Sequence, residues 1–200
     1  MVGKRQIKKE ETRKHLIVKA RELFSEHGVK EIGMRQLAKE SGLGLGTYYN
    51  YFKNKDEIIF AISDSIFSDM FKLEAAIIKS DKENSLSNLI IKYLEELSKN
   101  KEVITQLVQV ISHMDQYTDS ESEGRKFTEK HITNYTQVVS KYFTVKELSV
   151  DLQSFSRLCW HQLMIFIYMW FMDQSEGYSQ TKSFIQTTNR VLVNGALKRE

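Results

Sequence analysis

The stretch that decides the fold is MRQLAKESGLGLGTYYNYF, residues 34–52. Its spacing predicts two short helices, over about 34–41 and about 45–51, joined by a tight turn at Gly42. Ala38 is small where such helices would cross closely. The core between them is supplied by Leu37, Leu43, Tyr48 and Phe52. This pattern is typical of a helix-turn-helix, whose second helix enters the major groove of DNA. Taken alone, it also fits an ordinary helical hairpin with a glycine turn.

The segments on either side of this stretch carry helical patterns too. Ahead of it, apolar spacing predicts a helix over about 8–27, with Gly28 placed as a left-handed C-terminal glycine. The stripe on this helix consists of Leu16, Ala20, Leu23, Phe24 and His27. After the stretch, Asn54 and Glu57 form a capping-box-like pattern at the start of a helix predicted over about 55–79.

The rest of the chain is also predicted to be helical. Polar breaks separate helices expected at about 84–99, 101–114, 123–143, 149–173 and 180–198. The sequence contains no proline and nine glycines, so long helices can run uninterrupted, and it shows no strand alternation and no internal repeat. The predicted fold class is therefore all-α. A three-helix N-terminal domain with the helix-turn-helix is joined by a long fourth helix to a C-terminal helical bundle.

The composition is that of a globular protein. Of the 200 residues, 41% are hydrophobic and 28% are charged, which provides ample apolar material for a core. The single cysteine, Cys159, excludes an internal disulfide framework and suits a reducing cytoplasm. Because the charged N-terminus has no apolar stretch behind it, we expect no signal peptide. The segment 155–172 is interrupted by Arg157 and His161, and a membrane span needs roughly 20 mostly apolar residues, so a buried helix is expected there.

Charge is distributed unevenly along the chain. The net charge is only +3, but the first stretch of the chain is rich in basic residues and acidic groups crowd residues 115–123. The basic residues are Lys4, Arg5, Lys8, Lys9, Arg13, Lys14, Lys19 and Arg21. Such asymmetry directs the basic end toward a polyanion. A solvated basic helix face is the alternative interpretation.

The residues Gly46-Thr47-Tyr48-Tyr49-Asn50-Tyr51-Phe52-Lys53-Asn54-Lys55 closely resemble the signature of the tetracycline-repressor (TetR) family of bacterial regulators. The core and turn positions ahead of them also match: Ala20, Leu23, Phe24, Gly28, Arg35, Leu37, Ala38 and Gly42. The resemblance covers about residues 9–69. Beyond that, only length, helical character and order of elements agree.

The resemblance implies that the chain has two domains with separate functions. Residues 9–69 would be the DNA-binding domain, with the motif at about 32–51, and residues 70–200 would bind a small hydrophobic or aromatic ligand and form a homodimer. The protein would then be a repressor that the ligand releases from a palindromic operator. We expect it in the bacterial cytoplasm, associated with the nucleoid when bound, and without a membrane partner.

The resemblance also implies roles for residues that could contact the DNA backbone. Gly46 would let the backbone approach a phosphate closely. Thr47 and Tyr49 would offer hydroxyl groups to phosphate oxygens. Lys55 would add its charge to the positive end of the fourth helix and clamp a phosphate.

A second group is expected on the face toward the groove. It consists of Arg35, Leu45, Asn50 and Tyr51. Arg35 could read a guanine edge, Asn50 could pair with adenine and Leu45 could touch a thymine methyl group. Solvated side chains remain the alternative for Arg35, Asn50 and Tyr51.

Two features depart from the family pattern. Gly33 and Gly44 stand where the family usually has threonine and serine helix caps, which puts phosphate contacts through those hydroxyls in doubt. Leu45 replaces the polar residue often found at that position, so operator specificity cannot be carried over.

The C-terminal half contains two predicted sites. The dimer interface is expected on the last two helices, at Phe155, Phe184, Thr188, Val191, Leu192 and Gly195. The ligand pocket is expected among His113, Met114, Tyr117, Phe127, Tyr135, Trp160, His161, Met164 and Tyr168. Closure of a bundle within one chain and ordinary core packing are the respective alternatives.

Other functional classes find less support in the sequence. We expect no metal site, because the histidines lack further ligands nearby, and no cofactor. No paired nucleophile and base and no glycine-rich phosphate loop stand out, so we expect no enzyme. A global or architectural DNA-binding protein without an effector remains open, and a helical carrier or enzyme is a distant third.

Overall fold

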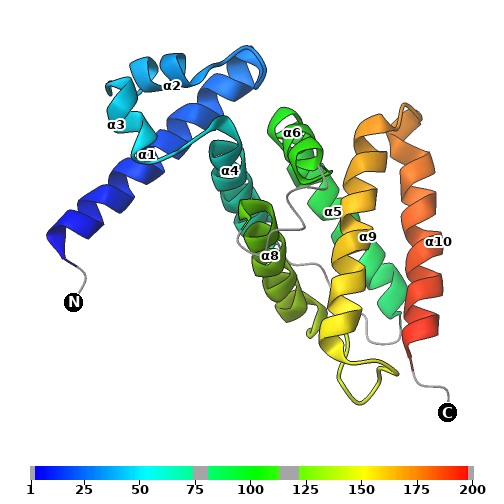
Figure 1. Ribbon diagram of the computed structural model, residues 1–200. Helices are drawn as coiled ribbons and strands as arrows, with labels where there is room; N and C mark the ends of the chain where they lie inside the picture. Colours follow the sequence, from blue (N-terminus) through cyan, green and yellow to red (C-terminus); the bar gives the residue numbers. More distant parts are fainter. Residues whose placement is uncertain (1–2, 74–80, 113–121, 198–200) are drawn as a thin grey trace. The chain divides into compact units, whose positions relative to one another are not determined.

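The computed structural model describes residues 3–73, 81–112 and 122–197, and these are almost entirely helical (Figure 1). The prediction of an all-α fold, with a helix-turn-helix before a helical domain, is confirmed. The chain divides into two compact units. Unit 1 contains Met1–Ile66 and Asn100–Arg125, and unit 2 contains Phe67–Lys99 and Lys126–Glu200.

Unit 1 is built on a long first helix. Its helices are α1 (Lys4–His27), α2 (Met34–Glu40), α3 (Leu45–Tyr49), the first part of α4 (Lys55–Met70) and α6 (Lys101–Ser112). Four residues of α1 are fully or almost fully buried, namely Leu16, Ala20, Leu23 and Phe24. His27 was expected on this stripe but is exposed, so the stripe ends at Phe24.

Two glycines shape the turns of unit 1. Gly42 has φ +69, and around it Gly42 N–H and Leu43 N–H donate to the carbonyl oxygens of Lys39 and Ala38, both at 3.0 Å. A positive φ favours glycine, and this turn brings α3 against α2. Gly28 also has a positive φ, of +87, but its ψ of 146 is not the left-handed helical value that we expected.

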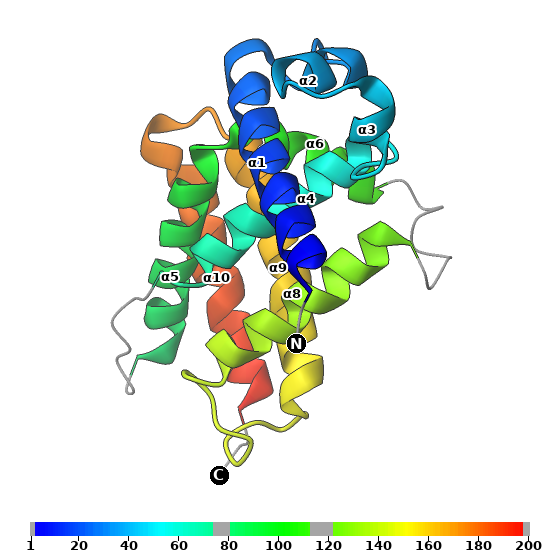
Figure 2. The same ribbon diagram turned by 90° about the vertical axis from the view of Figure 1, so that its left-hand side faces the viewer.

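Unit 2 is a helical bundle. Its helices are the end of α4, α5 (Lys82–Ser98), most of α8 (Glu123–Val139), α9 (Leu152–Met172), the short η1 (Glu176–Tyr178) and α10 (Ser179–Ala196). Helices α5 and α10 lie side by side, as both views show (Figures 1 and 2). Their interface contains a buried polar pair, in which the Asn189 side-chain amide donates to Ser87 Oγ at 3.0 Å.

Several helix boundaries differ from the sequence predictions. Helix α1 begins four residues earlier than expected, at Lys4, and α4 ends at Met70 rather than near 79, because Phe71 and Lys72 form a turn. Helix α9 begins at Leu152, where the Asp151 carboxylate accepts a hydrogen bond from Ser154 N–H at 2.8 Å. The expected end of α6, at 113–114, lies outside the described residues. Among the helices described, none has an apolar stretch long enough to cross a lipid bilayer.

Candidate nucleic-acid interface

A small aromatic core holds the helix-turn-helix in place. Tyr48 and Phe52 are fully buried, with ring centroids 5.9 Å apart, which agrees with their interpretation as core residues. The guanidinium carbon of Arg13 lies 4.9 Å from the centroid of the Phe52 ring. Burial raises the pKa of Tyr48 to about 12, so this phenol stays neutral. The inward face of α3 and the residues that follow it therefore pack inside unit 1, and Arg13 of α1 covers Phe52.

The outward side of the motif is exposed. Of the predicted DNA contacts, Arg35, Gly46, Thr47, Tyr49 and Asn50 are exposed, while Leu45, Tyr51 and Lys55 are half-buried. Most of these residues lie on α3 or directly after it, and Arg35 comes from α2. The sequence-predicted set is thus gathered in one motif, with its hydroxyl, amide and guanidinium groups accessible to a partner.

Gly46 occupies a position where the fold does not require glycine. It lies inside α3, it is not among the glycines with positive φ, and apart from its chain neighbours and the backbone of α3 no described heavy atom lies within 4 Å of where its Cβ would be. Glycine in a helix interior costs about 1 kcal/mol relative to alanine. The open space above Gly46 is therefore available to a close partner, as the DNA-contact interpretation needs.

Lys55 has a structural role that sequence reasoning missed. Its Nζ donates to the carbonyl oxygens of Val29 at 2.7 Å and of Ile32 at 3.2 Å. These contacts bind the first residue of α4 to the turn between α1 and α2. Two of its three donor hydrogens are thereby occupied, which leaves one for a phosphate.

The cap of α4 follows the expected pattern. Glu57 N–H donates to Asn54 Oδ1 at 2.9 Å, and Lys53 N–H donates to the Glu57 carboxylate at 2.8 Å. The predicted capping-box-like arrangement is thus confirmed, with Lys53 as the second donor. It fixes where α4 begins relative to α3.

Residues at the start of α6, far from the motif in sequence, form hydrogen bonds with α1 and with the turn that follows it. Val29 N–H donates to Glu102 Oε1 at 3.3 Å, and Arg21 Nε donates to Asn100 Oδ1 at 3.0 Å. The partners are separated by 73 and 79 residues, so no local sequence pattern signals them. Both contacts lie within unit 1.

An aromatic cluster occupies the interior of unit 2. The predicted pocket residues Phe127, Tyr135 and Trp160 are all buried. Phe127 and Trp160 both contact His131, which stacks on Trp160 with ring centroids 5.7 Å apart, and Tyr135 joins the cluster through Trp160. Sequence reasoning missed His131 and three further members of the cluster, namely Phe67, Phe71 and Tyr93. These residues were missed because the sequence of one helix does not indicate which other helices its aromatic residues will pack against.

The remaining predicted pocket residues do not join this cluster. Tyr168 is 58% exposed, and His161 is exposed with its Nδ1 2.7 Å from the Arg157 carbonyl oxygen, so both are corrected to surface positions. Met164 is half-buried. The predicted pocket positions His113, Met114 and Tyr117 lie outside the described residues.

The expected dimer surface needs one correction. Phe155 is fully buried within the chain, 5.0 Å from Phe143 between ring centroids, so it is a core residue. On α10, Val191 is 68% exposed, Thr188 and Leu192 are half-buried and Gly195 is exposed.

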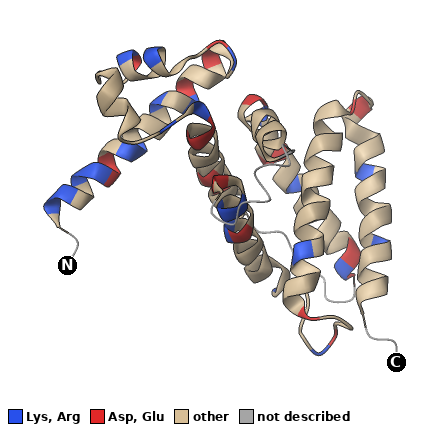
Figure 3. Cartoon of the chain, in the orientation of Figure 1, with Lys and Arg blue, Asp and Glu red and all other residues tan. Residues whose placement is uncertain are grey.

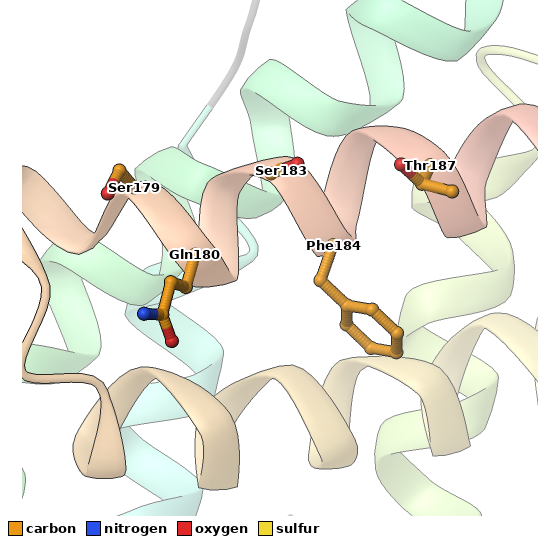
Figure 4. Close-up of a pocket in the computed structure, with 5 residues that line it drawn as sticks. All are labelled: Ser179, Gln180, Ser183, Phe184 and Thr187. Atoms are coloured by element: carbon orange, nitrogen blue, oxygen red, sulfur yellow. The ribbon is translucent and has the colours of Figure 1, made fainter.

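Exposed apolar residues gather on α9 and α10, the last two long helices of the chain. They are Leu158, Ile165, Tyr168 and Met172 on α9, and Phe184 and Val191 on α10. Phe184 points toward α9, where its ring meets Phe166 edge to face at 5.9 Å, and it lines a hollow of about 490 Å³ (Figure 4). The other residues lining the hollow are Ser179, Gln180, Ser183 and Thr187.

Comparisons with known proteins agree with this geometry. Residues 16–62 match the family described as bacterial regulatory proteins, tetR family. An HTH-type transcriptional regulator of Staphylococcus aureus strain bovine RF122 / ET3-1 is 42% identical over 52 residues, and that of strain USA300 is 40% identical over the same length. The match covers 26% of this chain and only 28% of each of these relatives.

Solved structures share the fold over nearly the whole chain. A TetR transcriptional regulator from Rhodococcus sp. RHA1 has a TM-score of 0.67 at 16% identity, covering 94% of this chain and 98% of that one. FadR from Thermus thermophilus, a TetR family repressor in complex with lauroyl-CoA, has a TM-score of 0.66 at 16% identity, covering 94% and 96%. Residues 85–198 match the tetracyclin repressor-like C-terminal domain, which alone is more than half of the chain. The chain therefore belongs to the TetR family of bacterial regulatory proteins.

Proposed function

We propose that this protein is a transcriptional regulator that binds DNA through α2 and α3 and acts as a repressor. The observation that supports this most strongly is the exposed, glycine-containing face of α3. Gly46 leaves open space next to the hydroxyl groups of Thr47 and Tyr49, although alanine would suit the helix better. A phosphate backbone is the partner that would use such space, because it needs close approach and hydrogen-bond donors.

Roles within the reading face follow from side-chain chemistry. Thr47, Tyr49 and the remaining donor of Lys55 would bind phosphates and set the position of α3. Arg35 and Asn50 would read base edges in the major groove, and Leu45 would contact a thymine methyl group. We assign residues 9–69 to DNA binding and residues 70–200 to ligand binding and dimerisation, although the compact unit around the motif also includes α6.

A titration of fluorescent duplex DNA from the gene's own upstream region tests this proposal. Wild-type protein is expected to bind it tightly, and Tyr49→Ala is expected to weaken binding. Val145→Ala is the control, since it removes an exposed side chain of unit 2 that lies outside α9 and α10. Equal binding to scrambled DNA would favour an architectural protein, and no binding at low salt would refute the proposal.

A second copy of this chain is the protein partner that we propose. The exposed apolar residues of α9 and α10 would pack against the same helices of the partner and form a four-helix interface. A twofold dimer presents two reading helices, so the operator is expected to be palindromic, with half-sites one helical turn or a multiple apart. The site of action would be the bacterial cytoplasm.

The proposed effector is a small hydrophobic or aromatic molecule. The buried aromatic cluster around Trp160 offers an apolar environment, and Tyr135 carries a hydroxyl group into it. Because FadR of Thermus thermophilus holds lauroyl-CoA, that compound is the first probe, followed by anilinonaphthalene sulfonate. An effector must bind the DNA-free state more tightly than the DNA-bound state. If no apolar compound changed operator affinity, this part of the proposal would fail.

A further inference from the structure

The N-terminal half of α1 buries none of its residues among the described residues. The first buried residue of α1 is Leu16, and residues 4–15 are exposed apart from the half-buried Thr12. At 1.5 Å per residue, these twelve residues form about 18 Å of mostly exposed helix. Figure 1 shows this half of α1 continuing past α3.

Most basic residues of this exposed half lie on a different side of the helix from the acidic residues. At about 100° per residue, its basic residues other than Lys14 fall within one half of the circumference. We call this surface the basic arc, and it consists of Lys4, Arg5, Lys8, Lys9 and Arg13. Glu10 and Glu11 fall in the other half, together with Lys14. The blue residues along this half of α1 are evident in Figure 3.

The charges of the basic arc are not neutralised within the described part of the chain. None of its five side chains forms an ion pair there, whereas Lys19 further along α1 pairs with Glu22 at 3.2 Å. Five neighbouring cations repel one another, so the arc favours a polyanionic partner.

The direction of the basic arc follows from helical spacing. Arg5, Lys9 and Arg13 continue, at intervals of four, the face that carries Leu16, Ala20 and Leu23 inside unit 1. Arg13 confirms this direction, because its guanidinium group lies over Phe52, three residues after the end of α3. The arc therefore opens on the side of α1 that carries α3.

We propose that the basic arc binds the phosphates of double-stranded DNA next to the segment that α3 reads. This inference rests on the proposed function, since α3 must bring the duplex to the arc. A duplex seated on α3 would extend beyond it, where the arc supplies cations at helical spacing. An anionic membrane is disfavoured, because the exposed apolar residues Ile7 and Val18 lie outside the arc and give it no inserting face.

Binding to phosphates has a measurable signature. Each neutralised phosphate releases counterions, so removing one phosphate-binding side chain makes the slope of log K against log salt shallower by about 0.9 for B-DNA. Phosphates carry no base information, so such a removal weakens binding to operator and to scrambled duplexes by the same factor. Removing a side chain that reads a base changes the ratio of the two affinities instead.

The experiment measures affinity for operator and scrambled duplexes at several salt concentrations. The test variants are Lys9→Gln and the double variant Arg5→Gln/Lys9→Gln. Lys14→Gln is the control on the same exposed half of α1 but outside the arc. Lys99→Gln/Lys146→Gln removes the same charge from unit 2. All four leave the buried face of α1 intact, and circular dichroism checks that they are folded.

We expect the double variant to make the salt slope shallower by about 1.8 for each bound chain and to leave the operator-to-scrambled ratio unchanged. The controls should match wild type. Wild-type slopes in the double variant would overturn the inference while leaving the proposed function intact. Equal slope changes in the double control would also overturn it, because net charge alone would then be responsible. Absence of DNA binding by wild-type protein would instead refute the proposed function.

Discussion

The Nζ atom of Lys55 lies 2.7 Å from the carbonyl oxygen of Val29, so the residue expected to clamp a phosphate also ties α4 to the turn after α1. Lys55→Met removes this contact and the one to Ile32. Because hydrogen bonds from a charged donor are worth about 1.5–3 kcal/mol when well buried and this site is partly exposed, we expect unfolding free energy to fall by about 1–2 kcal/mol. Urea unfolding measures this.

Lys53→Met is the control for that variant, since Lys53 is exposed and contributes its backbone N–H to the cap of α4. A change in DNA affinity without a change in unfolding midpoint for Lys55→Met would mean that the two carbonyl contacts do not stabilise the fold.

Gly46→Ala should separate stability from DNA binding. Alanine fits the helical backbone and meets no described atom within 4 Å, so the variant should be more stable by up to about 1 kcal/mol. A methyl group in the space proposed for a phosphate should weaken operator binding by roughly tenfold, which corresponds to about 1.4 kcal/mol.

Gly42→Ala is a comparison variant that should change stability in the opposite direction from Gly46→Ala. Gly42 has φ +69, so its substitution strains the turn and should lower the unfolding free energy. If Gly46→Ala bound the operator as well as wild type, the backbone approach at this position would be refuted.

Val191→Glu tests the proposed dimer surface. Val191 is 68% exposed in the single chain, so a carboxylate there costs the monomer little. In a packed interface the same charge would be buried, which is unfavourable by several kcal/mol. Sedimentation should therefore show a monomer that retains its helical content and binds the operator weakly. Val145→Glu, at an equally exposed valine outside both helices, should stay dimeric.

The helix-turn-helix was the most predictable part of the molecule because its signals are local. Gly42, Tyr48 and Phe52 specify their own turn and core within about twenty residues, and the structure agrees. The contacts of Lys55 could not be foreseen, since the carbonyl groups that it binds carry no side-chain signal. The pairing of Glu102 with Val29 depends on a separation of 73 residues along the chain.

The C-terminal half was less predictable for a related reason. A helix that is apolar on most sides, such as α9, does not indicate which side meets its own bundle and which stays exposed. Phe155 and Tyr168 were therefore assigned to the wrong environments, although the surrounding helix was correctly expected. His131 escaped notice because a single histidine within a polar stretch gives no sign of burial.

Acid should weaken the contact between Glu147 and Lys82 in unit 2. The Lys82 ammonium group and the donors of Thr144 lower the pKa of Glu147 from 4.5 to about 2. A carboxyl group whose pKa is lower in the folded state stabilises the fold above its unfolded pKa, and it loses that contribution as pH falls through the folded value. The free energy of unfolding should therefore decline as the pH falls from about 4.5 to about 2.

Glu147→Gln should make this decline shallower, as measured by urea unfolding at a series of pH values. Glu95→Gln, on an exposed position of α5, is the control and should follow wild type. Some acid sensitivity will persist, because hydrogen bonds from Ser175 and Thr181 also hold the pKa of Asp173 below its usual range. An unchanged pH profile in Glu147→Gln would show that the ion pair contributes nothing to stability.

Tyr135→Phe tests whether the aromatic cluster of unit 2 is built for a ligand. The Tyr135 side chain is fully buried, and its hydroxyl group has no hydrogen-bond partner among the described residues. An unpaired buried hydroxyl costs about 1–3 kcal/mol, so the phenylalanine variant should be at least as stable as wild type without ligand. A ligand that pairs with this hydroxyl would lose about 0.5–1.5 kcal/mol of binding free energy in the variant.

The measurements are thermal unfolding and fluorescence titration with lauroyl-CoA and anilinonaphthalene sulfonate. Tyr178→Phe removes a hydroxyl group from an exposed tyrosine outside the cluster and outside α9 and α10, and it should match wild type in both. Lower stability of Tyr135→Phe without ligand would show that the hydroxyl group serves the fold. If Tyr135→Phe were more stable than wild type and bound an operator-displacing compound more weakly, the Tyr135 hydroxyl group would serve effector binding at a cost in stability.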